Sequence, residues 1–129
     1  MIEAIKDVAA FHLACDIPIL AAPTVPSPSR VDLRVDLIEE EVNRELIPAM
    51  RKGDLVEIAD AMADSVYVII GAALEYGIPL DHVWAAVQDA NMAKVDPVTG
   101  KVWRREDGKV LKPPGWTPPD IRGALGLIT

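Results

Sequence analysis

The chain has 129 residues, 50% of them hydrophobic, and a formal net charge of -7; this suits one domain with a core and argues against a nucleic-acid partner, because binding to a phosphate backbone depends on Lys and Arg. No apolar run reaches the roughly 18 residues of a membrane helix, and MIEAIKDVAAFH lacks the basic start of a signal peptide, so we expect a soluble protein without a membrane partner. Cys15 is the only cysteine, which leaves no internal disulfide and fits a reducing cytoplasm.

The first predicted helix covers residues 2–14, where apolar residues recur at spacings of three and four. The following segment, IPILAAPTVPSPSR, holds four prolines. It cannot form a helix interior, because proline lacks the backbone donor and clashes with the preceding turn. We expect it to be a connecting loop.

A second helix is predicted over about residues 31–51, and Pro48 should kink or shorten it. Gly53 and Asp54 then form a helix stop followed by an N-cap. Such a short link favours an antiparallel pair with the third helix, which is predicted over about residues 55–76.

The third helix is acidic at its start and almost wholly apolar over residues 66–74. A helix that is apolar all round has to be buried on every side. One small domain does not provide that cover, so we expect a homodimer or a homotetramer. Gly77 should close this helix, and Asp81 should cap a fourth one over about residues 82–94.

These elements predict an all-α protein, an antiparallel helical bundle of four to five helices that is completed by oligomerisation and followed by an extended Pro-rich C-terminal tail. One domain is expected over residues 1–129, with the helical core over about 1–95 and the tail over about 96–129. No internal repeat is visible.

Carboxylates are concentrated on the second and third predicted helices. In LIEEEVNREL, Glu41 and Glu45 lie one turn apart, and in EIADAMAD the residues Glu57, Asp60 and Asp64 form one stripe. On antiparallel neighbours the two stripes can face each other, and like charges so placed repel and resist desolvation unless cations lie between them. Ligands that are all oxygen indicate Mg²⁺, with Mn²⁺ as a substitute. The alternative is a solvated helix face that binds no metal.

The stretches LIEEEVNREL and EIADAMADSVYVIIG, followed by NMAKVD, resemble the all-α nucleoside triphosphate pyrophosphohydrolases, which comprise MazG-like, phosphoribosyl-ATP pyrophosphatase-like and dimeric dUTPase-like proteins. The resemblance covers about residues 34–96 and extends more loosely through RREDGKVLKPPGW. The signature of that family is Glu-Glu-x-x-Glu on one helix and Glu-x-x-Asp on the next, and the resemblance implies that these acids bind Mg²⁺.

The first motif departs from the family signature by one residue. A strict Glu-Glu-x-x-Glu that starts at Glu40 ends on Arg44, whereas the glutamate stands one position later. We therefore predict Glu41 and Glu45 as a metal-binding pair, with Glu40 as an addition.

The second motif offers two aspartates. Glu57 and Asp60 have the family spacing, whereas Asp64 is the aspartate that precedes a short apolar run ending in Tyr, as in many members. All three acids are predicted metal ligands.

Members of this family cleave between the α and β phosphates of a nucleotide and release the monophosphate and pyrophosphate. The resemblance implies a Mg²⁺-dependent enzyme that acts on a nucleoside triphosphate, in nucleotide pool sanitation or dUTP-type control. Carboxylate-bound metal neutralises triphosphate charge and activates water, and a glutamate that is not fully used as a ligand accepts the proton of that water. Glu41 and Glu45 are the predicted catalytic residues, with Glu41 as the first choice for the base.

Polar and positive groups at the end of the fourth helix and beyond it are predicted to bind the substrate. Asn91 and Lys94 are similar to an Asn-x-x-Lys that the family has near the nucleotide. Arg105, Lys109 and Lys112 supply further positive charge, although charges on a loose tail equally suit a solubilising role.

The aromatic and imidazole groups have simpler interpretations. Trp103 and Trp116 either stack on a base or anchor the tail to the domain or to a partner subunit, and we favour the anchor. Trp84 is expected in a core or an interface. His12 is expected to be a packing residue and His82 an exposed residue of a first turn, and neither is spaced to form a nucleophile-base pair.

Three alternatives compete with this function. Phosphoribosyl-ATP hydrolysis is disfavoured by the long tail and the shifted first motif. A di-iron bundle needs Glu-x-x-His pairs, but Ala9 and Pro79 stand three residues before His12 and His82. A non-catalytic helical oligomerisation or regulatory module, whose acids are only a solvated surface, would tolerate replacement of Glu57 by Ala.

Overall fold

The computed structural model describes residues 1–127, which form two compact units: unit 1 over Met1–Pro79, and unit 2 from Leu80 onward. The regular structure of the described residues is helical, with two isolated β-bridges and no strand, so the all-α prediction is confirmed. The fourth predicted helix belongs to unit 2 together with the tail. Within residues 1–127, no helix is both long and apolar enough to cross a membrane.

A continuous helical rod forms one side of unit 1. It consists of α2 (Pro28–Ile38), η1 (Glu39–Leu46) and α3 (Ile47–Lys52), and the residues at the junctions keep right-handed helical angles. The rod begins three residues before the predicted start, because Pro28 occupies the first turn, where a missing N–H is tolerated.

The middle of the rod is a π-helix rather than an α-helix. The backbone N–H of Ile47 donates to the carbonyl oxygen of Val42, five residues earlier. Pro48 follows directly, in the first turn of α3. The predicted shortening at this proline is therefore wrong: the helix changes type before Pro48 and continues to Lys52, because proline is tolerated in the first turn of the new helical segment, where its N–H is not needed.

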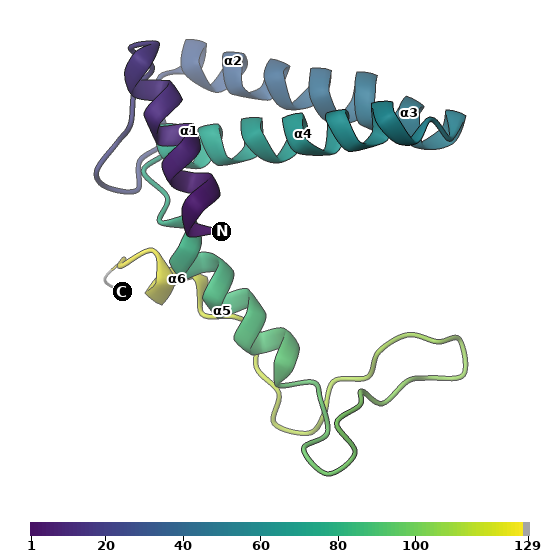
Figure 1. The fold of residues 1–129 in the computed structure, drawn as a ribbon. Helices are drawn as coiled ribbons and strands as arrows, with labels where there is room; N and C mark the ends of the chain where they lie inside the picture. The colour runs from purple at the N-terminus through teal and green to yellow at the C-terminus, as the bar shows by residue number, and fades with distance from the viewer. Residues whose placement is uncertain (128–129) are drawn as a thin grey trace. The chain divides into compact units, whose positions relative to one another are not determined.

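After α3 the chain reverses direction, so that the rod and α4 (Leu55–Glu75) form a helical hairpin. Figure 1 shows α4 running alongside the rod. Gly53 ends α3 in the left-handed conformation, with φ of +79°. Asp54 caps α4 by accepting hydrogen bonds from the backbone N–H groups of Val56 and Glu57. The predicted stop, cap and antiparallel pair are confirmed.

The core of unit 1 is thin. α1 (Ile2–Ala14) packs against α4, and the buried apolar side chains of the unit are mostly small: Val8, Ala49, Ala61, Ile70 and Ala73. On α4, Val66 is 51% exposed and Ile69 is 44% exposed. The prediction that this helix is buried on every side is therefore not met within the described chain.

Unit 2 begins with α5 (Leu80–Met92), which is followed by a loop with antiparallel bridges between Val95 and Val102 and between Arg104 and Val110, and then by α6 (Ile121–Ala124). Because α5 starts at Leu80, Asp81 lies inside its first turn and is not the predicted cap. A carboxylate is favourable there because it faces the positive end of the helix dipole.

Candidate metal centre

Three glutamates of the π-helix converge on one point. One carboxylate oxygen from each of Glu40, Glu41 and Glu45 lies within 4.8 Å of the other two. Glu41 is half-buried, whereas Glu40 and Glu45 are exposed on either side of it. The predicted pair Glu41 and Glu45 is thus brought together, and Glu40 joins it.

The π-helix explains this convergence. In an α-helix, residues five apart point in different directions, whereas hydrogen bonds that span five residues bring such residues to one side. Glu40 and Glu45 are five apart, and so are Glu39 and Arg44, which form an ion pair at 3.9 Å. The wider turn of the π-helix therefore accommodates the one additional residue of the first motif, and Glu40, Glu41 and Glu45 still lie on one face.

Glu41 is in an unfavourable position for a charged carboxylate. Its Oε2 atom is buried and has no hydrogen-bond partner within residues 1–127. Burial raises the pKa of Glu41 to about 7, helped by the adjacent Glu45 carboxyl and by the charges of Asp64 and Glu40. Asp64, on α4, therefore belongs to the same electrostatic cluster.

Such a cluster fits a hard divalent cation. It offers carboxylate oxygens alone, which is the donor type that Mg²⁺ and Mn²⁺ prefer. An unpaired buried oxygen on Glu41 is a free ligand atom, and a cation between the acids would remove the repulsion that raises the pKa of this group.

The remaining predicted ligands line a neighbouring cavity of about 380 Å³ between the rod and α4. Glu45, Glu57 and Asp60 all line it, so Glu45 belongs both to the carboxylate cluster and to the cavity. Glu57 is also ion-paired with Lys52 at 3.5 Å. The rest of the lining is Arg44, Pro48, Ala49, Lys52 and Ala61.

Arg44 and Lys52 are the residues at this cavity that the sequence interpretation missed. Both place positive charge beside the acids, and both lie on the rod. The available signal was position: Arg44 directly precedes Glu45, and Lys52 directly precedes the Gly53 turn. In the sequence alone, neither is recognisable as a substrate-binding residue, because only the helical hairpin brings both to the cavity with the acids.

The predicted substrate-binding residues all lie in unit 2, and three of them gather at Trp116. Lys94 donates to Asn91 Oδ1 at 3.1 Å, and its Nζ lies 5.1 Å from the centre of the indole ring. The Nζ of Lys112 lies 4.8 Å from the same centre. Both ammonium groups are held by cation–π contacts, and neither has a carboxylate within 4.0 Å among the described residues.

Arg105 and Lys109 occupy the turn of the tail loop instead. Arg105 is ion-paired with Asp107 at 2.7 Å, and the backbone N–H of Lys109 donates to the same carboxylate. The structure therefore does not bring these two side chains to Trp116 by any contact within the described chain.

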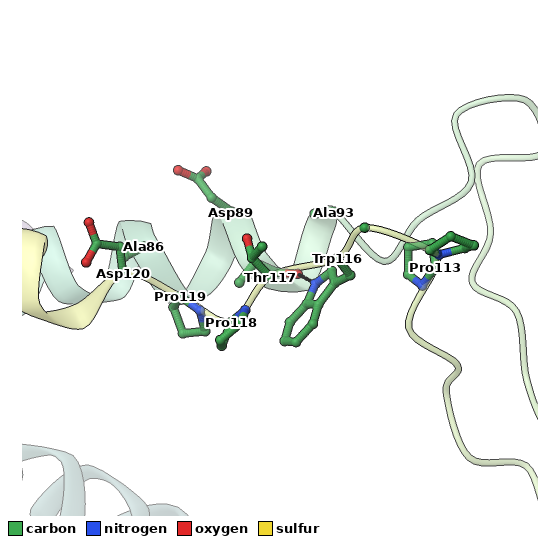
Figure 2. A pocket seen from close by; sticks show the side chains of 12 residues that line it. Ala86, Asp89, Ala93, Pro113, Trp116, Thr117, Pro118, Pro119 and Asp120 are labelled. Atoms are coloured by element: carbon green, nitrogen blue, oxygen red, sulfur yellow. Dashed lines mark hydrogen bonds between the residues drawn. The ribbon is translucent and has the colours of Figure 1, made fainter.

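Trp116 anchors the Pro-rich tail to α5. Its indole N–H donates to the carbonyl oxygen of Ala90 at 2.7 Å. Figure 2 shows the residues from Pro113 to Asp120 lying along the helix, where, together with residues of α5 that include Asp89, they line an open pocket of about 490 Å³. This agrees with the interpretation of Trp116 as an anchor, whereas Trp103 is 60% exposed.

The raised pKa of Glu41 predicts a pH-dependent stability in the absence of metal. The native carboxyl keeps its proton up to about pH 7, whereas the ordinary value is 4.5. Its contribution to the free energy of unfolding is thus present below pH 4.5 and lost as pH rises towards 7. Glu41→Gln is neutral at every pH, so we expect its stability relative to the parent chain to increase between these two values. Urea denaturation in the presence of a chelator measures this difference, and a difference that is constant with pH would contradict the expectation.

Comparison with known proteins agrees with the helical architecture. The family model described as phosphoribosyl-ATP pyrophosphohydrolase matches residues 8–91, which include the acids of both helices. An uncharacterized protein of Acanthamoeba polyphaga mimivirus, L479, is 48% identical over 56 residues, which are 43% of this chain and 22% of the viral protein. The matched segment is therefore a small part of that relative.

Proposed function

Because the chain belongs to the phosphoribosyl-ATP pyrophosphohydrolase family, we propose that it is a Mg²⁺-dependent nucleoside triphosphate pyrophosphohydrolase. It would cleave the bond between the α and β phosphates and release the monophosphate and pyrophosphate, in nucleotide pool sanitation or dUTP-type control. The observation that carries this proposal is the convergence of Glu40, Glu41 and Glu45, with an unpaired buried oxygen on Glu41.

The metal would be held by the acids of the two helices: Glu41 and Glu45 from the π-helix, and Glu57, Asp60 and Asp64 from α4. When bound, Mg²⁺ would neutralise the phosphate charge and lower the pKa of a bound water. Glu41 or Glu45, whichever keeps a free oxygen, would accept the proton of the attacking water. Arg44 and Lys52 line the same cavity as Glu45, so they are suited to contact phosphate oxygens.

In unit 2, Asn91, Lys94 and Lys112 remain proposed substrate-binding residues. Lys94 and Lys112 are held at Trp116 without a carboxylate partner among the described residues, and Asn91 orients Lys94. Arg105 and Lys109 remain proposed phosphate-binding residues, although Arg105 would first have to leave Asp107.

The test is a panel of canonical and damaged nucleoside triphosphates, with phosphoribosyl-ATP included, in the presence of Mg²⁺. Pyrophosphate and orthophosphate are assayed separately, with and without a chelator. Pyrophosphate release from one or a few triphosphates that ceases on chelation supports the proposal. Release of orthophosphate alone, or no release from any compound, contradicts it.

Phosphoribosyl-ATP is the second candidate substrate, because the matching family model carries that activity in its description. Both substrates present a triphosphate and need the same metal centre, so the carboxylates do not distinguish them. Hydrolysis of phosphoribosyl-ATP alone in the panel would select this candidate.

We also propose that the chain assembles as a homodimer or homotetramer through α4. Between α1 and α4 lies an apolar groove of about 390 Å³ to which Met62, Val66 and Tyr67 contribute, and Val66 and Ile69 are exposed on the same helix. A second copy that presents the same apolar helix would cover these side chains in a two-fold arrangement.

Val66→Asp is therefore expected to convert the oligomer to a monomer, because a carboxylate would be buried in an apolar interface. Light scattering coupled to size-exclusion chromatography measures the mass. Leu13→Asp, which changes an apolar side chain that is 72% exposed on α1, is the matched control and should leave the mass unchanged. A parent chain that is already monomeric would contradict the assembly.

A further inference from the structure

Unit 1 buries a group of charged side chains away from the carboxylate cluster. Glu75, near the end of α4, is only 2% exposed, and Arg34 of α2 is 5% exposed. Arg34 Nε lies 3.5 Å from Glu75 Oε2, and Arg30, one turn earlier on α2, donates from Nε to Glu75 Oε1 at 2.9 Å. Two arginines of one helix thus share one buried carboxylate of another.

Arg34 also reaches the backbone of α4. Its Nη2 donates to the carbonyl oxygen of Val68 at 3.0 Å. Its side chain therefore touches α4 at two points, Val68 and Glu75, which lie almost two helical turns apart. Contacts between apolar side chains permit a helix to slide along its neighbour, whereas a directional hydrogen bond and an ion pair to two separate points do not.

Gly71 provides the space for this arginine. A Cβ atom at position 71 would collide with Arg34 Nη2 and would lie 2.9 Å from His12 Nε2. Gly71 lies inside α4, four residues before its last residue, where glycine is less favourable than alanine for the helix. Burial holds the pKa of His12 below its ordinary value, so a neutral imidazole lies beside the guanidinium.

The same helices carry the acids. Glu41 lies seven residues beyond Arg34 on the continuous rod, about 10 Å along its axis. On the antiparallel α4, Asp64 lies four residues from Val68 in the same direction, about 6 Å along the axis. A shift of the rod along α4 would therefore carry Glu41 and Glu45 away from Asp64.

We propose that Arg34, lying on Gly71 and paired with Glu75, is a positioning residue that sets the register of the rod against α4 and so holds Glu41 and Glu45 opposite Asp64. The inference rests on the proposed function for its effect on metal binding, but the register itself can be measured without metal or substrate.

The experiment uses the full chain with Gly71→Ala and, separately, Arg34→Lys. Lysine keeps the positive charge but has one ammonium nitrogen in place of the rigid guanidinium, which contacts Val68 through Nη2 and Glu75 through Nε. Val8→Ala is the control, because it truncates a buried core residue and leaves the Arg34 contacts in place. Circular dichroism checks folding, and Mn²⁺ binding is followed by electron paramagnetic resonance. We expect both Gly71→Ala and Arg34→Lys to weaken Mn²⁺ binding at least about tenfold, and Val8→Ala to leave it unchanged.

Rescue separates positioning from simple loss of stability. Lysine has no Nη2 atom, so Gly71→Ala combined with Arg34→Lys removes the collision with the guanidinium and leaves only the close approach to His12. We expect this double variant to bind Mn²⁺ better than Gly71→Ala alone. If Gly71→Ala does not fold, the comparison of Mn²⁺ affinity between Arg34→Lys and Val8→Ala tests the proposal. Wild-type Mn²⁺ affinity in a folded Gly71→Ala or in Arg34→Lys, or an equal loss in Val8→Ala, would overturn the proposal.

A distance measurement between the two helices tests the positioning role of Arg34 independently of the proposed function. Spin labels at positions 36 and 59, both exposed and on the two paired helices, report the register in a chain whose Cys15 is replaced by Ser. We expect the label-to-label distance to shift or broaden in Arg34→Lys and to stay unchanged in Val8→Ala. If the parent chain binds no Mn²⁺ and hydrolyses nothing, the proposed function fails, and the label distance alone then supports or overturns the positioning role.

Discussion

Glu45→Gln is expected to lower the rate of pyrophosphate release by more than about 100-fold, since it removes one charge from the carboxylates that would hold the metal. Glu45 is the one acid among the described residues that belongs both to the cluster with Glu40 and Glu41 and to the cavity with Glu57 and Asp60. Glutamine keeps the size of the side chain and its place on an exposed helix surface, so folding should be preserved. The rate at saturating substrate and the calorimetric affinity for Mn²⁺ measure the effect.

Glu39→Gln is the matched control for this change. Glu39 lies on the same π-helix and also loses one negative charge, but it is outside the cluster and is paired with Arg44 at 3.9 Å on the surface. Surface pairs of this kind contribute little, and we expect a rate within about twofold of the parent. Equal rates for both variants would show that the cluster has no part in the reaction.

Gly77→Ala is expected to destabilise the chain by about 3 kcal/mol, the sum of two costs. Gly77 follows α4 with φ of +63°, a conformation that costs a residue with a Cβ atom about 1–2 kcal/mol. A Cβ atom here would also collide with the backbone of Ala22, and such overpacking adds about 1–3 kcal/mol. The loop has little freedom to move away, because the N–H of Leu20 donates to Leu74 and that of Thr24 to Tyr76.

Gly53→Ala separates the two costs. Gly53 has φ of +79° at the end of α3, but no atom lies within 4 Å of the position that its Cβ would take. We expect the conformational cost alone, about 1–2 kcal/mol. Urea denaturation of both variants gives the comparison, and a Gly53→Ala that is as destabilised as Gly77→Ala would refute the role of the Ala22 contact.

The helices themselves could be predicted from the sequence because their signals are local. The apolar spacing of residues 2–14 and the Gly53-Asp54 pair depend only on near neighbours, and both predictions are confirmed. The starts of α2 and α5 were misplaced by a few residues, since Pro28 and Asp81 are each compatible with either side of a helix start.

The candidate site could be predicted only in part. Two acidic stripes on antiparallel helices follow from helical periodicity, so the pairing of Glu41 with Glu45 was accessible. Glu40 was predicted as an addition to that pair, but the π-helical turn that brings it to Glu45 was not predicted, because π-helices are rare. The one-residue excess in the first motif was its only visible sign.

By itself, the sequence determined the helical class, the turn at Gly53 and an acidic stripe on each of the two helices that this turn joins, because periodicity and capping act over a few residues. The tertiary structure decided the π-helical turn that gathers Glu40, Glu41 and Glu45, and the burial of Arg34 of α2 against Glu75 of α4. Charged residues in a sequence indicate a solvated surface by default. Only the packing of α2 against α4, between residues 34 or more positions apart in the chain, supplies the partners that allow such charges to be buried, together with the space at Gly71.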